Sequence, residues 1–224
     1  MKTLYLSPST QENNIGVGDY GTEEFRCNLI ADVIEKELVN NGIKIYRNKP
    51  DMTLSKIVKE SNGYNVDVHL AVHTNAYNKL ARGAEIYVHE KGGYSESFAK
   101  SIYKRIEKMT PVKDRGVKQG KDYYGKGKHI YELANVSCTA ALIEISFHDN
   151  IDDAKWIVEN IENIGINIAN GVLEYFGVEK KNDNESKLYR VMVGSYKNLP
   201  NAKNHVKALQ DKNIDSCIIP YDLD

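Results

Sequence analysis

Cysteine is scarce in this chain of 224 residues: Cys27, Cys138 and Cys217 are far apart in the sequence. They form no CxxC pair and their number is odd, so the sequence indicates neither a disulfide framework nor a cysteine zinc site. A reducing compartment at synthesis is the simplest interpretation.

An excess of charge of one sign is also lacking. The chain has 30 Lys and Arg against 31 Asp and Glu, a net charge of −1 at pH 7. No strongly basic balance points to nucleic acid as a partner. The remaining composition, 41% hydrophobic and 27% charged, is ordinary for one large globular domain or for one domain with a small appendage.

Long apolar segments are missing as well. No segment could span a bilayer, so we expect no membrane insertion. Residues 1–8 lack the apolar core of a signal peptide, so we expect synthesis in the cytoplasm without one. Action outside the cytoplasm would then need another route of release.

Residues 66–76 form the stretch around which the rest of the chain is arranged. Apolar and polar residues alternate from Val66 to His73, which predicts a strand that carries His69 and His73 on one face. His73 lies at the carboxyl end, where α/β proteins gather ligands and catalytic groups, and so is a candidate metal ligand or proton carrier. His69, in mid-strand, is more typical of a hydrogen-bonded core histidine.

Strands and helices are predicted to alternate along most of the chain. Thr22 and Ser95 are expected to cap helices, and Asn150 to begin one long helix. This order predicts an α/β fold with a mostly parallel sheet and helices on both faces. Strands are expected at 3–7, 43–46, 66–76, 83–89 and 139–147, helices at 22–40, 53–61, 95–109 and 150–176, and a long loop at 112–128.

Residues 16–21 match the GxGxxG pattern of dinucleotide-binding proteins. Gly16 does not follow the first strand directly, and the strand at 43–46 runs into Arg47 and Asn48 instead of an acidic residue. Both features of the fingerprint are therefore missing, and we expect no nucleotide cofactor.

Carboxylates stand at two informative places. Glu23 and Glu24 occupy the first turn of the helix after Thr22, where they either complement the helix dipole or face the same crevice as His73. Glu144 interrupts the apolar run 139–147, which is typical of a strand buried on both faces. A carboxylate there is costly unless it is paired or near a metal, so we interpret Glu144 as a functional acid or base.

The last part of the chain differs in composition. Residues 179–187 form a charged, hydrophobe-poor linker. A strand at 189–196, a helix at 201–212 and a strand at 216–219 would follow as a small C-terminal βαβ module, which is too small to bury a core unaided.

Three stretches together resemble a known family: 22–24, 71–76 and 142–150. Their order and spacing are similar to those of the zinc-dependent N-acetylmuramoyl-L-alanine amidases of the type-3 class. Those enzymes cut bacterial peptidoglycan between the lactyl group of N-acetylmuramic acid and L-alanine. The segments 82–87 and 115–117 also resemble that family, and the resemblance covers residues 2–177.

The resemblance implies roles for three residues. Glu23 and His73 would be zinc ligands and Glu144 the catalytic glutamate, with Glu24 as the competing ligand because a slip of one residue is open. Catalytic zinc keeps three protein ligands and an open position for water. Zn2+ is therefore the expected cofactor, and hydrolysis of peptidoglycan, with lysis of the cell wall, is the expected function.

The first zinc ligand departs from the family pattern. Relatives usually carry a histidine after the first strand, whereas this chain has Ser7–Glu12 there and no histidine before His69. An amide oxygen is a weaker zinc ligand than imidazole, so the alternative is a non-catalytic peptidoglycan-binding protein that has lost its metal. Gln11 is the predicted replacement; Asn13, Glu12 and, with unusual geometry, His69 or His148 are the others.

The C-terminal segment 189–197 is similar to the start of a sporulation-related repeat that binds peptidoglycan. We therefore predict a catalytic domain at 1–178, a linker at 179–187 and a wall-binding module at 188–224. Only about half of a repeat is present, so two halves could pair across a homodimer through their strand edges. A phage endolysin released through a membrane lesion and an autolysin freed by mother-cell lysis both remain open.

Overall fold

Six strands of the described residues form one sheet in the order β2–β1–β3–β6–β4–β5. The computed structural model describes residues 1–112, 115–181 and 193–220. All neighbouring strands run parallel except β4 and β6, which are antiparallel, and this confirms the predicted mostly parallel α/β sheet. The strands are β1 (Thr3–Pro8), β2 (Lys44–Arg47), β3 (Val68–Asn75), β4 (Glu85–Val88), β5 (Val117–Gln119) and β6 (Thr139–Phe147).

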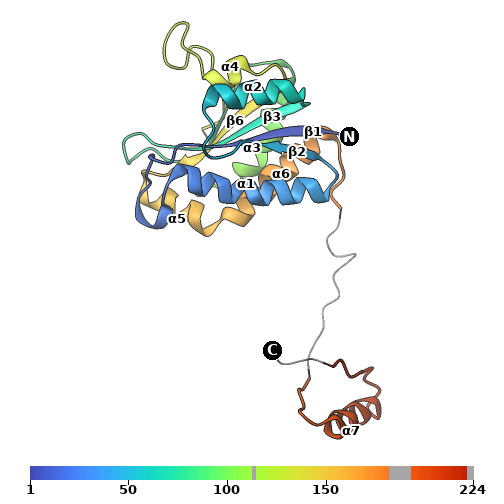
Figure 1. The fold of residues 1–224 in the computed structure, drawn as a ribbon. Helices are drawn as coiled ribbons and strands as arrows, with labels where there is room; N and C mark the ends of the chain where they lie inside the picture. The colour runs from blue at the N-terminus through green and yellow to red at the C-terminus, as the bar shows by residue number, and fades with distance from the viewer. Residues whose placement is uncertain (113–114, 182–192, 221–224) are drawn as a thin grey trace. The chain divides into compact units, whose positions relative to one another are not determined.

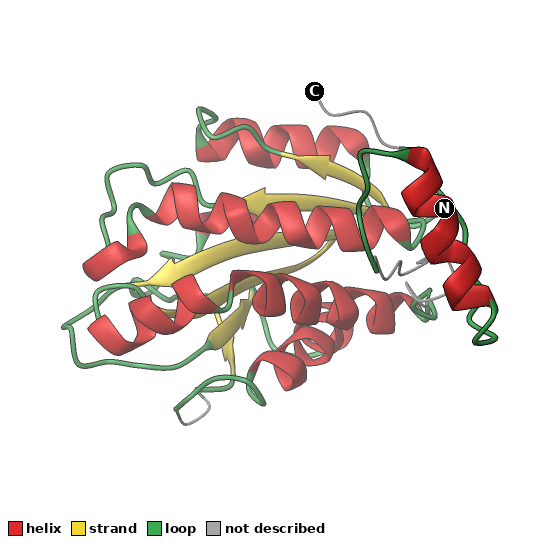
Figure 2. Ribbon diagram, turned by 90° about the horizontal axis from the view of Figure 1, so that it is seen from below, coloured by secondary structure: helices red, strands yellow, loops and turns green. Residues whose placement is uncertain are grey.

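Helices cover both faces of the sheet (Figure 1). The main core, built from β-branched and leucine side chains of the central strands, lies under α1, α3 and α6. Seen from below in Figure 2, the helices lie side by side across this face. The helices of the larger unit are α1 (Glu23–Asn40), α2 (Leu54–Tyr64), α3 (Gly93–Ile106), α4 (Tyr131–Asn135), α5 (Ile151–Glu159) and α6 (Ile161–Phe176), with a 3-10 turn η1 (Gly18–Tyr20).

Three expected boundaries differ from the structure. The third long helix begins at Gly93, so Ser95 does not cap it; the Ser95 hydroxyl instead accepts a hydrogen bond from Ala140 N at 3.1 Å. The expected long helix is broken at Asn160, whose side-chain amide donates to Trp156 O at 2.8 Å and so competes with the backbone ladder. The expected loop at 112–128 contains the short strand β5, paired with β4.

The chain divides into two compact units, Met1–Lys181 and Asn182–Asp224. In the second unit α7 (Leu199–Gln210) matches the predicted helix, and none of its residues is buried. The predicted strand at 216–219 is wrong, and 193–196 also form no strand. An isolated strand without partners is not stable in water. Residues 189–192 of the other predicted strand lie outside the described residues.

None of the helices in the described ranges is long and apolar enough to cross a membrane.

A buried polar network ties the sheet to the helices of its second face. His69 Nε2 donates to Glu132 Oε1 at 2.8 Å, and the Ser7 hydroxyl donates to the same oxygen at 2.5 Å. Ser61 Oγ lies 2.9 Å from His69 Nδ1 and so connects α2. His69 is therefore a core residue, fully buried and stacked on the Tyr5 ring. Burial would raise the pKa of Glu132, but the hydrogen bond and charge of His69 outweigh it and lower that pKa.

We expect Glu132→Gln to lower the free energy of unfolding by about 1–3 kcal/mol at pH 7, because a buried donor loses its charged acceptor. Because folding lowers the pKa of Glu132, the ionised carboxylate stabilises the fold at pH values above the ordinary glutamate pKa of about 4.3. This stabilisation is lost as the pH falls from there through the lower pKa of the folded state. The difference between parent and variant should therefore shrink in acid. Urea unfolding measured from pH 7 down to about pH 3 tests this.

The matched control is Glu90→Gln, which removes an exposed ion pair with Lys121. Because this pair is exposed and screened by solvent, the substitution should change the free energy of unfolding far less than Glu132→Gln does. An unchanged stability of Glu132→Gln at pH 7 would show that the network does not hold α4 to the sheet.

Candidate active site

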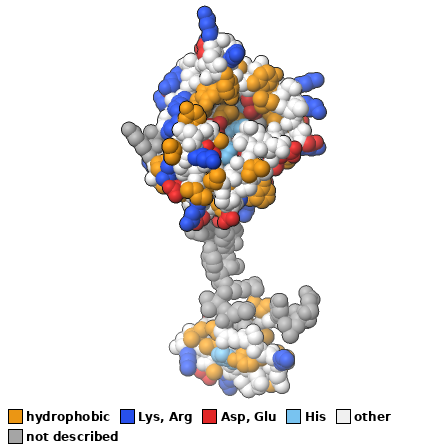
Figure 3. Space-filling model, turned by 90° about the vertical axis from the view of Figure 1, so that its left-hand side faces the viewer, with side chains coloured by type: hydrophobic (Ala, Val, Ile, Leu, Met, Phe, Trp, Pro, Cys, Tyr) orange, Lys and Arg blue, Asp and Glu red, His pale blue; other side chains and the backbone are white. Residues whose placement is uncertain are grey.

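Three predicted site residues meet at the carboxyl edge of the parallel strands. His73 on β3 and Glu144 on β6 are direct register partners, so both side chains leave the same face of the sheet. Glu23, at the first turn of α1, places Oε1 2.9 Å from His73 Nδ1. Figure 3 views this edge and shows histidine and carboxylate atoms at the bottom of a hollow with hydrophobic side chains around it.

Glu23 is positioned by the start of α1. Thr22 caps the helix, its hydroxyl accepting from Phe25 N at 3.2 Å, and the positive end of the helix favours a carboxylate in the next position. The Glu23 side chain is 1% exposed, and Asn14 Nδ2 donates to its Oε2 at 2.6 Å. Burial would raise the pKa of Glu23, but hydrogen bonds from His73, Ser9 and Asn14 outweigh it and lower that pKa.

Glu24 points elsewhere. Its carboxylate accepts a hydrogen bond from Asn28 Nδ2 at 2.9 Å, one turn along the same helix. Of the two candidates left open by the sequence, the geometry therefore brings Glu23 and not Glu24 to His73.

Glu23 fixes the His73 ring and favours either its protonated form or its binding to a cation. Burial alone would lower its pKa, but the hydrogen bond and charge of Glu23 outweigh it and raise the pKa of His73 to about 9. The ring therefore sits in a strongly negative environment, with Glu23 on one side and Glu144 on the neighbouring strand. Such a position attracts cations.

Glu144 has the opposite character. Burial raises its pKa to about 8, and the charges of Glu23 and Glu85 act in the same direction. Its Oε2 atom is buried and has no hydrogen-bond partner among the described residues. A buried oxygen left without a partner in the protein points to a missing group, such as a substrate, a water molecule or a metal.

A buried series of hydrogen-bonded side chains, which the sequence did not predict, ends at Glu23 and holds its carboxylate in place. His148 Nε2 donates to Asn14 Oδ1 at 3.1 Å, and Asn14 in turn donates to Glu23. Thr74 Oγ1 lies 2.9 Å from His148 Nδ1, and the Tyr20 hydroxyl bonds to Thr74. Burial lowers the pKa of His148, which suits a neutral ring that accepts on one side and donates on the other.

Gly16 leaves room for Tyr20 and His148 to pack in this hydrogen-bonded series. A Cβ atom there would lie 2.3 Å from the Tyr20 ring and 2.9 Å from His148 O, which is closer than real Cβ contacts. Gly16 belongs to the GxGxxG match, and its contacts give that glycine a packing role beside the candidate site.

The loop after β1 brings further oxygen atoms to the site. Residues 10–14 line an open surface pocket beside Glu23. Gln11 lies in this loop with an exposed side chain, and its backbone carbonyl accepts from Glu24 N at 3.4 Å. Glu12 and Asn13 are also exposed. The side chains of this loop that hydrogen-bond to Glu23 are those of Ser9 and Asn14.

The donor set can be compared with what zinc requires. Among the described residues no group of three His, Cys, Asp or Glu side chains could hold a metal ion. Glu23 and His73 supply a carboxylate and an imidazole, both common zinc ligands, with their donor atoms already 2.9 Å apart. The partnerless Glu144 Oε2 lies on the adjacent strand. Glu23 and His73 therefore have the chemistry and the spacing to supply two ligands to a divalent ion.

Comparison with known proteins identifies the family. The sequence profile of the N-acetylmuramoyl-L-alanine amidase family matches residues 7–174, and the chain belongs to this family. A profile of the SPOR domain matches residues 144–220. The part of that match before residue 182 lies in the larger unit, in β6, α5 and α6.

Individual relatives agree with this assignment. The N-acetylmuramoyl-L-alanine amidase CwlM of Bacillus licheniformis is 22% identical and is matched over 99% of this chain and 86% of its own length. The sporulation-specific N-acetylmuramoyl-L-alanine amidase of Bacillus subtilis gives the same identity and coverage.

The fold is shared with a solved structure, the catalytic domain of the amidase CwlV from Bacillus (Paenibacillus) polymyxa var. colistinus. The TM-score is 0.71 at 20% identity, over 80% of this chain and 100% of that domain. The family match over residues 7–174, with which this fold agrees, makes the chain an N-acetylmuramoyl-L-alanine amidase, a hydrolase.

Proposed function

We propose that this amidase hydrolyses the bond between the lactyl group of N-acetylmuramic acid and L-alanine, with zinc held by Glu23 and His73 and with Glu144 as the catalytic acid and base. The observation that carries the proposal is the convergence of these three side chains, from α1, β3 and β6, at one edge of the sheet. We further propose that the reaction lyses the cell wall after the protein is released from the cytoplasm, as an endolysin or an autolysin.

The residues that would hold zinc can be named. Glu23 and His73 would hold it together with an oxygen of the 9–14 loop, for which Gln11 remains the predicted residue. When bound, zinc supplies a Lewis acid that polarises the scissile carbonyl and lowers the pKa of water. Asn14 orients the Glu23 carboxylate through its 2.6 Å hydrogen bond, and His148 fixes Asn14.

Glu144 is suited to move the proton. Its pKa of about 8 lies close to neutral pH, where a group exchanges protons in both directions most effectively. The carboxylate accepts a proton from the attacking water, and the resulting acid donates it to the leaving amine of L-alanine. The buried Oε2 atom has no partner in the described protein that would compete for this proton.

Glu144→Gln should lower the rate of amide cleavage by about 10²–10⁴-fold, because general acid–base catalysis contributes on that order. The measurement is release of new amino termini, and loss of turbidity, from purified cell walls. Glu174→Gln, which removes a surface carboxylate paired with Lys104 and Arg105, is the control and should retain the parent rate. Retained cleavage by Glu144→Gln would remove Glu144 from the mechanism.

Glu23→Gln should reduce the zinc content of the purified protein, whereas Glu24→Gln should keep it. The two substitutions remove the same charge in the same helical turn, but only Glu23 contacts His73. Elemental analysis after dialysis measures the zinc-to-protein ratio. Equal zinc in both variants would reject Glu23 as a ligand, and no zinc in the parent would favour the peptidoglycan-binding protein that has lost its metal.

The smaller unit, 182–224, is proposed to hold the enzyme on the wall. The SPOR match that reaches residue 220 supports this role. We also propose a homodimer in which two such units pair, because the helix of a single unit has no buried residue and so leaves its apolar side chains without a core.

A chain ending at Lys181 should therefore sediment less with purified walls than the full chain does. It should retain hydrolysis of soluble muropeptides, because the catalytic candidates all lie in the unit Met1–Lys181. Unchanged co-sedimentation would contradict wall targeting by residues 182–224.

A further inference from the structure

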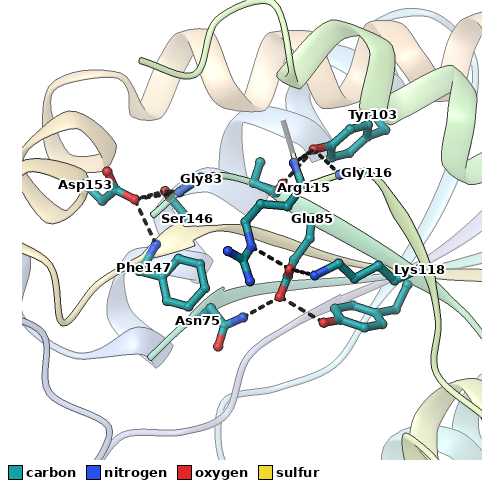
Figure 4. Close-up of polar contacts among 12 residues, drawn as sticks. Asn75, Gly83, Glu85, Tyr103, Arg115, Gly116, Lys118, Ser146, Phe147 and Asp153 are labelled. Carbon is teal, nitrogen blue, oxygen red and sulfur yellow. Dashed lines mark hydrogen bonds and ion pairs between the residues drawn. The ribbon is translucent and has the colours of Figure 1, made fainter. Parts of the chain in front are cut away.

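Two cations share one buried carboxylate beside the candidate catalytic residue. Glu85, at the start of β4, is 2% exposed and accepts hydrogen bonds from four side chains (Figure 4). Burial would raise the pKa of Glu85, but these hydrogen bonds outweigh it and lower that pKa, so the group is ionised at neutral pH. The donors are Arg115 Nε at 2.7 Å, Lys118 Nζ, Asn75 Nδ2 at 2.8 Å and the Tyr87 hydroxyl at 2.9 Å.

The cluster carries more positive than negative charge. Arg115 and Lys118 bring two charges to a carboxylate that carries one, and both cations remain about one-third exposed, at 34% and 35%. The Arg115 guanidinium lies against the Phe147 ring, 4.9 Å from its centroid. Within the described part of the chain its two terminal nitrogens have no hydrogen-bond partner, so they remain available to an anion.

The cluster lies next to the candidate catalytic group. Glu85 and Glu144 are directly opposite each other in the antiparallel pair of β4 and β6, and so project from the same face. Adjacent strands are about 4.8 Å apart. His73, Glu144 and Glu85 therefore form a row across β3, β6 and β4, with the two cations at the end of the row.

We propose that Arg115 and Lys118 form a subsite for a carboxylate of the peptide stem, on the leaving-group side of the scissile amide. This subsite rests on the proposed function. An extended peptide advances up to about 3.5 Å per residue, so a carboxylate carried by the first or second residue beyond L-alanine reaches one strand spacing from Glu144.

The chemistry of the substrate favours the peptide over the sugar. In the substrate the lactyl carboxyl of N-acetylmuramic acid is consumed in the amide, so the glycan strand offers the cations no carboxylate. A stem peptide with an acidic residue beyond L-alanine does offer one. A planar guanidinium can donate two parallel hydrogen bonds to a carboxylate. The hydrogen bond from Arg115 Nε to Glu85 orients the guanidinium of Arg115 for this.

The test compares two ligands that differ only in their carboxylates: N-acetylmuramoyl-L-alanyl-D-glutamate and its diamide. Binding is measured by calorimetry with full-length Glu144→Gln protein, so that cleavage during the titration is minimal. The acid should bind on the order of tenfold more tightly than the diamide, the size expected for one hydrogen bond between charged groups. Arg115→Gln added to this protein should bring the ratio close to one, and Lys118→Gln should reduce it in part.

The variants are chosen so that folding does not decide the result. Each single substitution leaves one cation on Glu85, and thermal unfolding checks that the fold is kept. Lys121→Gln is the matched control, because Lys121 follows β5 closely but pairs with the exposed Glu90, and it should leave the ratio unchanged. Arg115→Lys keeps the positive charge but loses the two parallel N–H donors. It should give a ratio of acid to diamide affinity between those of the parent and Arg115→Gln.

The subsite would be overturned by equal binding of acid and diamide before Arg115 is changed, or by an equal loss of affinity for both ligands in Arg115→Gln. Tighter binding of inorganic phosphate or of teichoic acid than of the muropeptide would also reject it, in favour of another anion. Amine release by the parent from cell walls tests the proposed hydrolysis separately. Absent cleavage with ligand discrimination intact would contradict the hydrolysis and support the subsite.

Discussion

The contact between Glu23 and His73 is the constraint on which the site depends. The two residues are far apart in the chain, and they meet only because α1 begins at the same edge of the sheet at which β3 ends. A helix N-terminus stabilises the carboxylate, and the carboxylate stabilises a charged or ligating imidazole. The buried chain through Asn14, His148 and Thr74 fixes the carboxylate from the other side, so the pair is oriented before any ligand arrives.

Three glutamates on or beside one row of strands illustrate how environment assigns different roles to one residue type. Glu23 is kept ionised by His73 and neutral donors, and Glu85 is kept ionised by two cations. Glu144, between them, has no such partner and holds its proton more tightly. Because the pKa values of these carboxyl groups differ widely, one site can hold a cation, bind an anion and transfer a proton at the same pH.

Much of this arrangement could be predicted from residue patterns. The alternation around His73, the apolar run around Glu144 and the capped helix at Thr22 each specify local structure, and βα order specifies the edge at which they meet. The supporting chain could not be predicted, because Asn14, Thr74 and His148 lie in loops or at strand ends where no periodicity fixes a direction. The same holds for β5, which is too short to show a pattern and exists through its pairing with β4.

The reversal of β4 has a consequence for how this scaffold could vary. Because β4 and β5 run against the other strands, they begin, and do not end, at the edge where the site lies. The connection from β3 to β4, residues 76–84, therefore starts and finishes at that edge, and Asp153 fastens its last residues by bonding to Gly83 N at 2.9 Å. The short turn after β4, by contrast, lies at the far edge. Insertions at 76–84 would therefore reshape the edge that carries Glu23, His73 and Glu144 without disturbing the parallel half of the sheet.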